Sequence, residues 1–262
     1  MPEFLFHLPF PAATLLVIGA LCSYSLAGLA VTRRWILPRF DPEADDSDFI
    51  GAMVQAVMVF YGLAVALVAV SVWETHADIS NLISEEASRI GGLYHDVGGY
   101  PEPVRTEMRD ELRGYTDYLI HEAWPNQSDG RPANRGVEWM RRFQSNLCGF
   151  EPGTEGQKAL HGETLAAYNR LIEARRLRLD AMGTKLPSEL WFIINFGACI
   201  SMAATFFFKV REVRLHIIQV LLLAVFVGLV ISMILAFDRP FLGDLGIGSE
   251  PYQVIRDQLM AE

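Results

Sequence analysis

Cysteine and histidine are scarce in this chain of 262 residues, which contains three cysteines and six histidines. Cys22 and Cys199 lie within apolar segments, and Cys148 lies in a polar stretch. The sequence has no CxxC pair and no Cys/His spacing suited to zinc. We therefore expect neither a disulfide framework nor a structural metal site.

Motifs of known enzyme classes are also missing. No GxSxG, HExxH or P-loop pattern occurs. Glu74, His76 and Asp78 do not share one face of a helix. His95 and Asp96 are adjacent in sequence, so their side chains point apart. The sequence thus predicts no catalytic residue, no metal and no cofactor, and a protein that is not an enzyme.

Positively charged residues are fewer than negatively charged ones. The formal net charge is -9, with 22 Lys and Arg against 31 Asp and Glu. A cluster of acidic residues contributes to this balance: Asp41, Glu43, Asp45, Asp46 and Asp48. No basic patch of the kind that binds nucleic acid is present, so we expect no nucleic-acid partner.

Apolar residues, in contrast, are abundant and gathered in long runs. The chain is 51% hydrophobic with a mean hydropathy of +0.23, although 20% of its residues are charged. Apolar and charged residues must therefore be segregated along the sequence, as in a membrane protein. Four apolar runs, each close to the roughly 20 residues that a helix needs to cross hydrocarbon, lie at about 11–31, 51–73, 189–208 and 215–237.

The strength of the fourth run can be assessed on an insertion scale. Between Ile217 and Phe237 it holds fifteen Leu, Ile, Val or Phe residues, which favour membrane insertion by roughly 4 to 9 kcal/mol. No ionisable side chain lies at the centre of any of the four runs. A proton-coupled pump or transporter normally needs such a group, so this class is disfavoured.

Between the second and third runs, apolar residues recur at a spacing of three and four, as on an amphipathic helix. The second spanning helix is predicted to continue through Val97 until Gly98 and Gly99 stop it. A second helix is predicted from Val104 to Trp124, followed by a polar loop at 126–134, a short helix at 136–147 and a long helix that ends at Gly183.

These features predict an all-α integral membrane protein with four transmembrane helices in two pairs and an extramembrane helical bundle between them. The expected organisation is a first helix pair in 1–73, a helical domain in 74–188, a second helix pair in 189–237 and a C-terminal tail in 238–262.

Several short motifs make the chain similar to a known family. They are Trp73-Glu74, Glu85-Glu86-Ala87-Ser88, Leu93-Tyr94, Tyr115, Glu122-Ala123-Trp124-Pro125, Arg175, Arg178, Leu186-Pro187, Trp191 and Asp238-Arg239-Pro240-Phe241-Leu242-Gly243. With these motifs the chain resembles the bestrophin-like membrane proteins of bacteria and plants, a family defined by a domain of unknown function. In the family pattern the glutamate directly precedes the tryptophan, whereas here Ala123 stands between Glu122 and Trp124.

The resemblance implies likeness to bestrophins, which are pentameric chloride channels whose second helices line the pore and whose large domain is cytosolic. It implies a homo-oligomer in the lipid bilayer, permeable to chloride or another small anion, and located in the inner membrane of a bacterium.

Within the second span, several small or amide residues lie close to one helical face: Gly51, Gln55, Gly62, Ala66 and Ala69. This face either lines a narrow pore or lets helices approach closely. Phe60 and Tyr61 form an apolar constriction if several chains surround an axis, and otherwise contact lipid or a neighbouring subunit. The candidate pore-lining residues are therefore Gln55, Phe60, Tyr61 and Gly62.

The ends of the spans carry a second group of candidates. Asp238 and Arg239, at the end of the fourth span, are predicted to pair with Glu74 or with Arg175 and Arg178 in a structural clamp. The alternative role for the arginines is an ion-entry vestibule, in which exposed guanidinium groups raise the local anion concentration.

Two functions are consistent with the sequence. The first is a homo-oligomeric anion channel whose second helices line the pore. The alternative is a non-conducting membrane scaffold or sensor whose helical domain binds a partner.

Overall fold

The structure is a computed structural model that describes residues 5–6, 8–39, 44–128, 136–208, 210, 212–242 and 246–260, without the side chains of 44–48, 50 and 128. The acidic cluster at 41–48 lies outside the described side chains, and residues 129–134 of the predicted polar loop lie outside the described residues.

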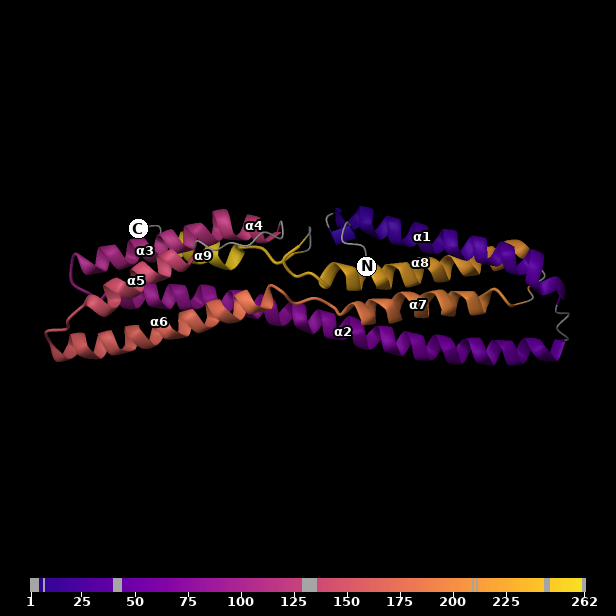
Figure 1. Cartoon of the computed structure of the whole chain (residues 1–262), viewed down its shortest axis with the longest axis horizontal. Coiled ribbons are helices and arrows are strands. Elements are labelled where there is room, and N and C mark those ends of the chain that lie inside the picture. Colours follow the sequence, from indigo (N-terminus) through magenta and orange to yellow (C-terminus); the bar gives the residue numbers. More distant parts are fainter. Residues whose placement is uncertain are drawn as a thin grey trace. The chain divides into compact units, whose positions relative to one another are not determined.

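Helices account for all regular secondary structure in these described ranges (Figure 1). The α-helices are α1 (Phe10–Val31), α2 (Ala44–Val97), α3 (Val104–Tyr118), α4 (Trp124–Ser128), α5 (Gly136–Gly149), α6 (Glu155–Ala181), α7 (Ser188–Thr205), α8 (Val213–Phe237) and α9 (Glu250–Leu259). Four of them, α1, α2, α7 and α8, contain a stretch long and apolar enough to cross a membrane. The predicted all-α class and the four spans are confirmed.

The chain forms two compact units. The first contains the described residues of Met1–Thr75 and Lys185–Arg239. The second contains His76–Thr184, Pro240–Leu242 and the described residues that follow Gly246. Helix α2 contributes its earlier part to the first unit and its later part to the second.

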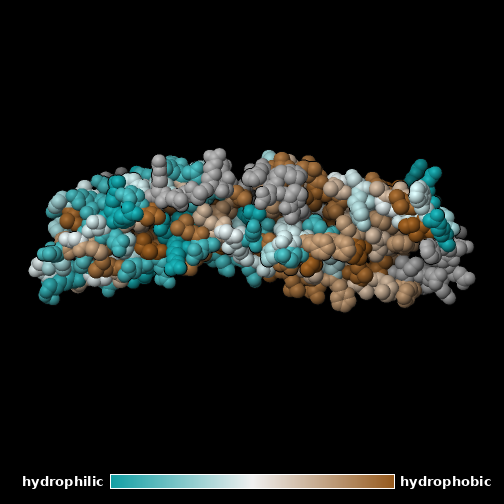
Figure 2. Space-filling view, in the orientation of Figure 1, coloured by the Kyte–Doolittle hydropathy of each residue, from teal (hydrophilic) through white to brown (hydrophobic). Residues whose placement is uncertain are grey.

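In the first unit, α1 packs along α8 and both contact α7. A glycine on α8 permits the close approach to α1, because a Cβ atom at Gly228 would lie 2.8 Å from Cγ1 of Ile18. The buried core includes Val17, Trp191 and Ile231. Many apolar side chains remain outside it, and brown apolar residues dominate the visible surface over these helices (Figure 2). An apolar exterior is expected where the solvent is hydrocarbon.

In the second unit, a helical bundle encloses a conventional apolar core. The predicted stripe on α2 is buried, with Ile83, Ile90, Leu93 and Val97 each 0% exposed. Helix α2 ends at Val97, where the sequence predicts its stop. Polar residues dominate the visible surface of this unit (Figure 2), as expected for a domain that faces water.

Two sequence predictions in this unit need correction. The helix predicted to end at Trp124 continues, because a π-helical turn at Leu119–Ala123 leads directly into α4. A π-helical turn accommodates one residue more than an α-helical turn, which fits the extra Ala123. Pro125 does not stop the helix, because it directly follows a π-helical turn, whose i−5 bonding already departs from the regular α-helical pattern that a proline interrupts.

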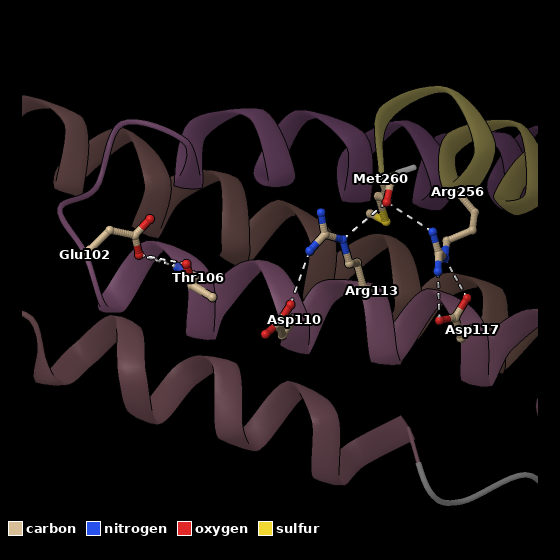
Figure 3. A network of polar contacts seen from close by, with 7 residues as sticks. All are labelled: Glu102, Thr106, Asp110, Arg113, Asp117, Arg256 and Met260. Carbon is tan, nitrogen blue, oxygen red and sulfur yellow. Dashed lines mark hydrogen bonds and ion pairs between the residues drawn. The ribbon is translucent and has the colours of Figure 1, made fainter. Parts of the chain in front are cut away.

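The predicted C-terminal tail contains a helix that the sequence did not reveal. Helix α9 docks on α3 through Arg256, whose Nε donates to Oδ1 of Asp117 at 2.7 Å (Figure 3). Arg113 of α3 also donates from Nε to the carbonyl oxygen of Met260 at 3.2 Å. With ten residues, α9 is too short to be stable alone in water, so these tertiary contacts are needed to hold it.

The contact between α3 and α5 makes stability depend on pH. Glu111 is half-buried and accepts a hydrogen bond from Nδ2 of Asn146 at 3.0 Å, while its Oε2 has no partner among the described residues. Burial is the main cause that raises the pKa of Glu111, to about 7. A carboxyl group with a raised folded-state pKa binds protons preferentially in the folded chain, so the contribution of Glu111 to stability is largest at low pH and is lost as pH rises through that pKa.

We therefore expect the unfolding midpoint of the wild-type protein to contain a component that decreases as pH rises from the ordinary glutamate range to about pH 7. Glu111→Gln should remove this component. Thermal unfolding in detergent at a series of pH values measures it, with the exposed Glu163→Gln as the control. An unchanged pH profile in Glu111→Gln would contradict the assignment.

Candidate functional site

The candidate pore-lining residues lie on α2 within the first unit. Gln55, Phe60 and Gly62 are exposed in the isolated chain, and Phe60 is 73% exposed. Tyr61 is different, because its hydroxyl donates to the carbonyl oxygen of Ile194 on α7 at 3.2 Å. Its ring also fills the space beside Gly197, where a Cβ atom would lie 2.7 Å from Cδ2 of the ring. Tyr61 packs between α2 and α7 in this structure, and the pore role of all four residues stays a prediction.

The exposed face of α2 has two edges of different character. At about 100° of rotation per residue, Gln55 and Gly62 lie within roughly 20° of each other around the helix axis. Phe60 is roughly 140° from Gln55 by the same geometry. A small polar edge and a bulky apolar edge, to which the exposed Leu67 also belongs, therefore face different directions. Gln55 and Phe60 therefore cannot both point directly at the central axis of one pore.

The predicted clamp residues fall in both units. Glu74 is exposed and belongs with Asp238 and Arg239 to the first unit, whereas Arg175 and Arg178 belong to the second. Their joint clamp stays a prediction.

Asp238 is the centre of a polar cluster at the end of α8. One carboxylate oxygen accepts from the backbone N–H of Leu186, and the other accepts from Nε1 of Trp191 at 3.2 Å. Arg239 lies 3.9 Å from the same carboxylate, and its guanidinium is 4.9 Å from the ring centre of Phe6. Burial raises the pKa of Asp238, and the two hydrogen bonds oppose that rise. Asp238 thereby ties the end of α8 to the beginning of α7.

The vestibule hypothesis needs a correction at Arg178. This side chain is buried, with 1% exposure, and forms an ion pair with Glu86. Arg175 is half-buried and lies close to Tyr168, whose pKa is raised by burial and lowered by this arginine. Of the three arginines, Arg176 alone is an exposed side chain. A buried and neutralised guanidinium does not attract ions from solution.

The partner of Arg178 is the most deeply buried carboxylate among the described residues of the second unit. Glu86 of α2 is 0% exposed and has three donors from three other helices. Tyr115 of α3 donates to Oε1 at 2.7 Å, Tyr252 of α9 donates to Oε2 at 2.9 Å, and Nε of Arg178 on α6 donates to the same Oε2. One carboxylate thus joins four helices.

An aromatic wall closes this cluster. The guanidinium of Arg178 lies 5.7 Å from the ring centre of Trp124, within the range of a cation–π interaction. Tyr252 and Phe241 contact the same indole, with ring centres at 5.3 Å and 6.0 Å. The indole N–H donates to the carbonyl oxygen of Ile247 at 2.9 Å. Phe241, Ile247 and Tyr252, which all follow α8 in the sequence, are therefore held against Trp124 in the core of the bundle.

The electrostatics of the cluster indicate a structural role. Burial is the main cause that raises the pKa of both Tyr115 and Tyr252, and Glu86 adds to it, so both phenols remain protonated donors. Burial by itself lowers the pKa of Arg178, but Glu86 raises it above its ordinary value. The carboxylate accepts three hydrogen bonds and is paired with the guanidinium of Arg178, whose Nη1 is buried without a hydrogen-bond partner among the described residues. The opposite charge and the three donors stabilise the carboxylate in the core.

The position of Glu86 in the sequence indicated that its side chain is buried, but the sequence analysis gave this residue no role. Glu86 lies at helical spacing between Ile83 and Ile90 on the buried stripe of α2. A charged residue on a buried face is rarely left unpaired. Its position therefore required a partner, and the tertiary structure identifies Arg178 with Tyr115 and Tyr252.

The fold defines an integral membrane protein of four spanning helices, with a helical bundle between the two pairs in the sequence. The chain belongs to the bestrophin-like family, because the model of the Bestrophin-like domain matches residues 19–252. It is a membrane protein of the bestrophin type.

Two solved structures are similar in fold. A variant of a bacterial bestrophin homologue from Klebsiella pneumoniae has a TM-score of 0.60 at 8% sequence identity, covering 95% of this chain and 99% of the other. A variant described as a membrane protein has a TM-score of 0.60 at 10% identity, covering 94% and 97%. No curated protein matches the sequence. At these identities the likeness concerns the fold alone.

Proposed function

We propose that this protein is a homo-oligomeric anion channel in a bacterial inner membrane, with α2 as the pore-lining helix of each subunit. The observation that carries the proposal is the bare face of α2, which has an exposed amide at Gln55 and exposed apolar side chains such as Phe60 within a spanning helix. Membership of the bestrophin-like family supports a channel of this type.

The chemistry of the bare face suits a small anion such as chloride. An amide presents N–H donors to an anion without the desolvation cost that a charged group carries inside a membrane. A ring of bulky apolar residues forms a constriction that conducts only when it is wetted. Gln55 and Phe60 lie on different edges of α2. A rotation of α2 about its own axis would therefore replace one of these side chains by the other at the centre of the pore.

The direct test is halide efflux from liposomes that contain the purified protein, compared with empty liposomes. We expect Gln55→Glu to reduce efflux by about tenfold or more, because a fixed negative charge repels the permeating anion at short range.

Phe60→Ala should increase efflux if the bulky edge forms the constriction. Phe226→Ala is the matched control, since Phe226 is an exposed phenylalanine on α8.

The pattern of responses distinguishes the two edges of α2. An effect of Gln55→Glu with a silent Phe60→Ala places the small polar edge at the axis, and the reverse pattern places the bulky edge there. Efflux equal to that of empty liposomes, together with crosslinking to dimers at most, would contradict the channel. That result would favour the alternative of a non-conducting scaffold whose helical domain binds a partner.

A further inference from the structure

The connection between α7 and α8 borders a cavity within the first unit that the proposed pore does not use. Its volume is about 260 Å³. That is several times the roughly 30 Å³ of a water molecule and near the lower end of the roughly 300–1,000 Å³ of small-molecule sites. The apolar part of its lining consists of Phe208, Val210, Val220 and Leu223. The space therefore suits part of an apolar chain.

The polar part of the lining contains an unsatisfied group. His216 is 2% exposed, and its Nε2–H donates to the carbonyl oxygen of Thr205 at 3.1 Å. Its Nδ1 is buried without a partner in the part of the chain that the structure describes. Because Nε2 carries the proton in this hydrogen bond, Nδ1 of the neutral imidazole is an acceptor. Nδ1 is covered by neighbouring atoms in the isolated chain, so a ligand hydroxyl would reach it once the side chains that line the cavity shift.

Two arginines and one glutamate, Glu212, lie at this end of α8, so basic side chains outnumber acidic ones among the described residues there. His216 lies in the first turns of α8, whose N-cap residue Glu212 makes no side-chain capping bond. The first N–H groups of a helix have no acceptor within the helix, so those of α8 can bind an anion. Arg214 is exposed on this turn, and Arg33 donates to the carbonyl oxygen of Val210, a residue that lines the cavity. The ends of spanning helices are also where lipid phosphates lie.

We propose that this cavity is a binding site for an anionic phospholipid whose headgroup carries a free hydroxyl. The phosphate binds the first turn of α8 together with Arg214. The hydroxyl donates to Nδ1 of His216, and part of an acyl chain lies against Phe208 and Leu223. Such a lipid combines the three features that the cavity offers: an anion site, an unpaired acceptor and an apolar wall.

The test measures how much lipid the full-length protein retains in detergent. Native mass spectrometry would compare phosphatidylglycerol, which has headgroup hydroxyls, with phosphatidylethanol, a monoanionic phosphodiester without them, and with phosphatidylcholine, which is zwitterionic. We expect retention in that order, with phosphatidylglycerol highest. Arg214→Gln should lower phosphatidylglycerol retention by about tenfold, the effect of one lost charge-assisted hydrogen bond.

A pair of tryptophan variants tests the cavity itself. Leu223→Trp fills the cavity and should abolish the preference for phosphatidylglycerol, whereas Leu222→Trp, at a position 65% exposed on the same helix, should retain it. If Leu223→Trp fails to fold, the exposed Arg214→Gln still tests the site.

Three results would overturn the proposal. One is equal retention of phosphatidylglycerol and phosphatidylcholine by the wild-type protein. Another is thermal protection by inorganic phosphate equal to that by phosphatidylglycerol, which would indicate a site for a free anion. The third is a crosslink between two chains that each carry Leu223→Cys, which would show that a second copy covers the cavity.

Discussion

Replacing Glu86 by glutamine is expected to lower the free energy of unfolding by about 3–5 kcal/mol, the cost of leaving a buried ionic partner uncompensated. The guanidinium of Arg178 is 1% exposed, so it cannot regain water when its partner becomes neutral. The amide also replaces one of the two acceptor oxygens that now bind Tyr115, Tyr252 and Arg178. We expect the loss in a denaturant titration in detergent, followed by tryptophan fluorescence to which the buried Trp124 contributes.

The neighbouring glutamate is a matched control. Glu85 is exposed and forms a surface ion pair with Arg89 at 3.0 Å, so Glu85→Gln should change stability by at most about 0.5 kcal/mol. The double variant Glu86→Gln with Arg178→Met removes both charges and keeps an amide oxygen as an acceptor for the phenols, and we expect it to recover part of the loss. Equal stability of Glu86→Gln and Glu85→Gln would contradict a central role for the buried carboxylate.

The second large effect is expected at Asp238. Asp238→Ala leaves the N–H of Leu186 and Nε1 of Trp191 without their acceptor. With about 1–3 kcal/mol for each of the two buried donors left unsatisfied, the free energy of unfolding should fall by roughly 2–6 kcal/mol. Because these donors lie at the beginning of α7, the second helix pair should separate at a lower temperature. Thermal unfolding in detergent measures this change.

Two further variants sharpen this prediction. Asp238→Asn keeps one carbonyl acceptor and should lose less than Asp238→Ala. Burial raises the pKa of Asp238, so its ionised form is disfavoured and the neutral amide is a closer substitute than at an exposed aspartate. Glu189→Ala removes an exposed acid from the first turn of α7 and should be nearly neutral. A loss in Glu189→Ala as large as that in Asp238→Ala would contradict the role of the cluster.

The spans and the bundle stripe were predictable because they depend on local periodicity and transfer free energy. The run that ends at Phe237 favours hydrocarbon whatever it packs against, and α8 ends at that residue. The stop of α2 at Val97 follows from Gly98 and Gly99, which weaken a helix locally. The division into 1–73, 74–188, 189–237 and 238–262 as membrane and extramembrane parts stays a prediction.

Helix α9 and the start of α4 were not predictable in the same way. A ten-residue amphipathic segment has little helical stability of its own, and Arg256 with Tyr252 stabilises it only once α3 and α2 are in place. Proline interrupts a regular α-helix because it lacks an N–H and its ring crowds the preceding turn. The helix continues past Pro125 after the π-helical turn before it, which the sequence did not reveal.

By itself the sequence determined that this is an all-α membrane protein of four spans, and its motifs indicated the bestrophin-like family. Only the tertiary structure decided that Arg178 is buried against Glu86, that Tyr61 faces α7 while Phe60 is bare, and that His216 borders a cavity. The physical reason is that hydropathy and helical period act along the chain, over a few residues. Ion pairs, ring contacts and cavities join side chains that are distant in the sequence, as Glu86 and Arg178 are, and these exist only after the helices have packed.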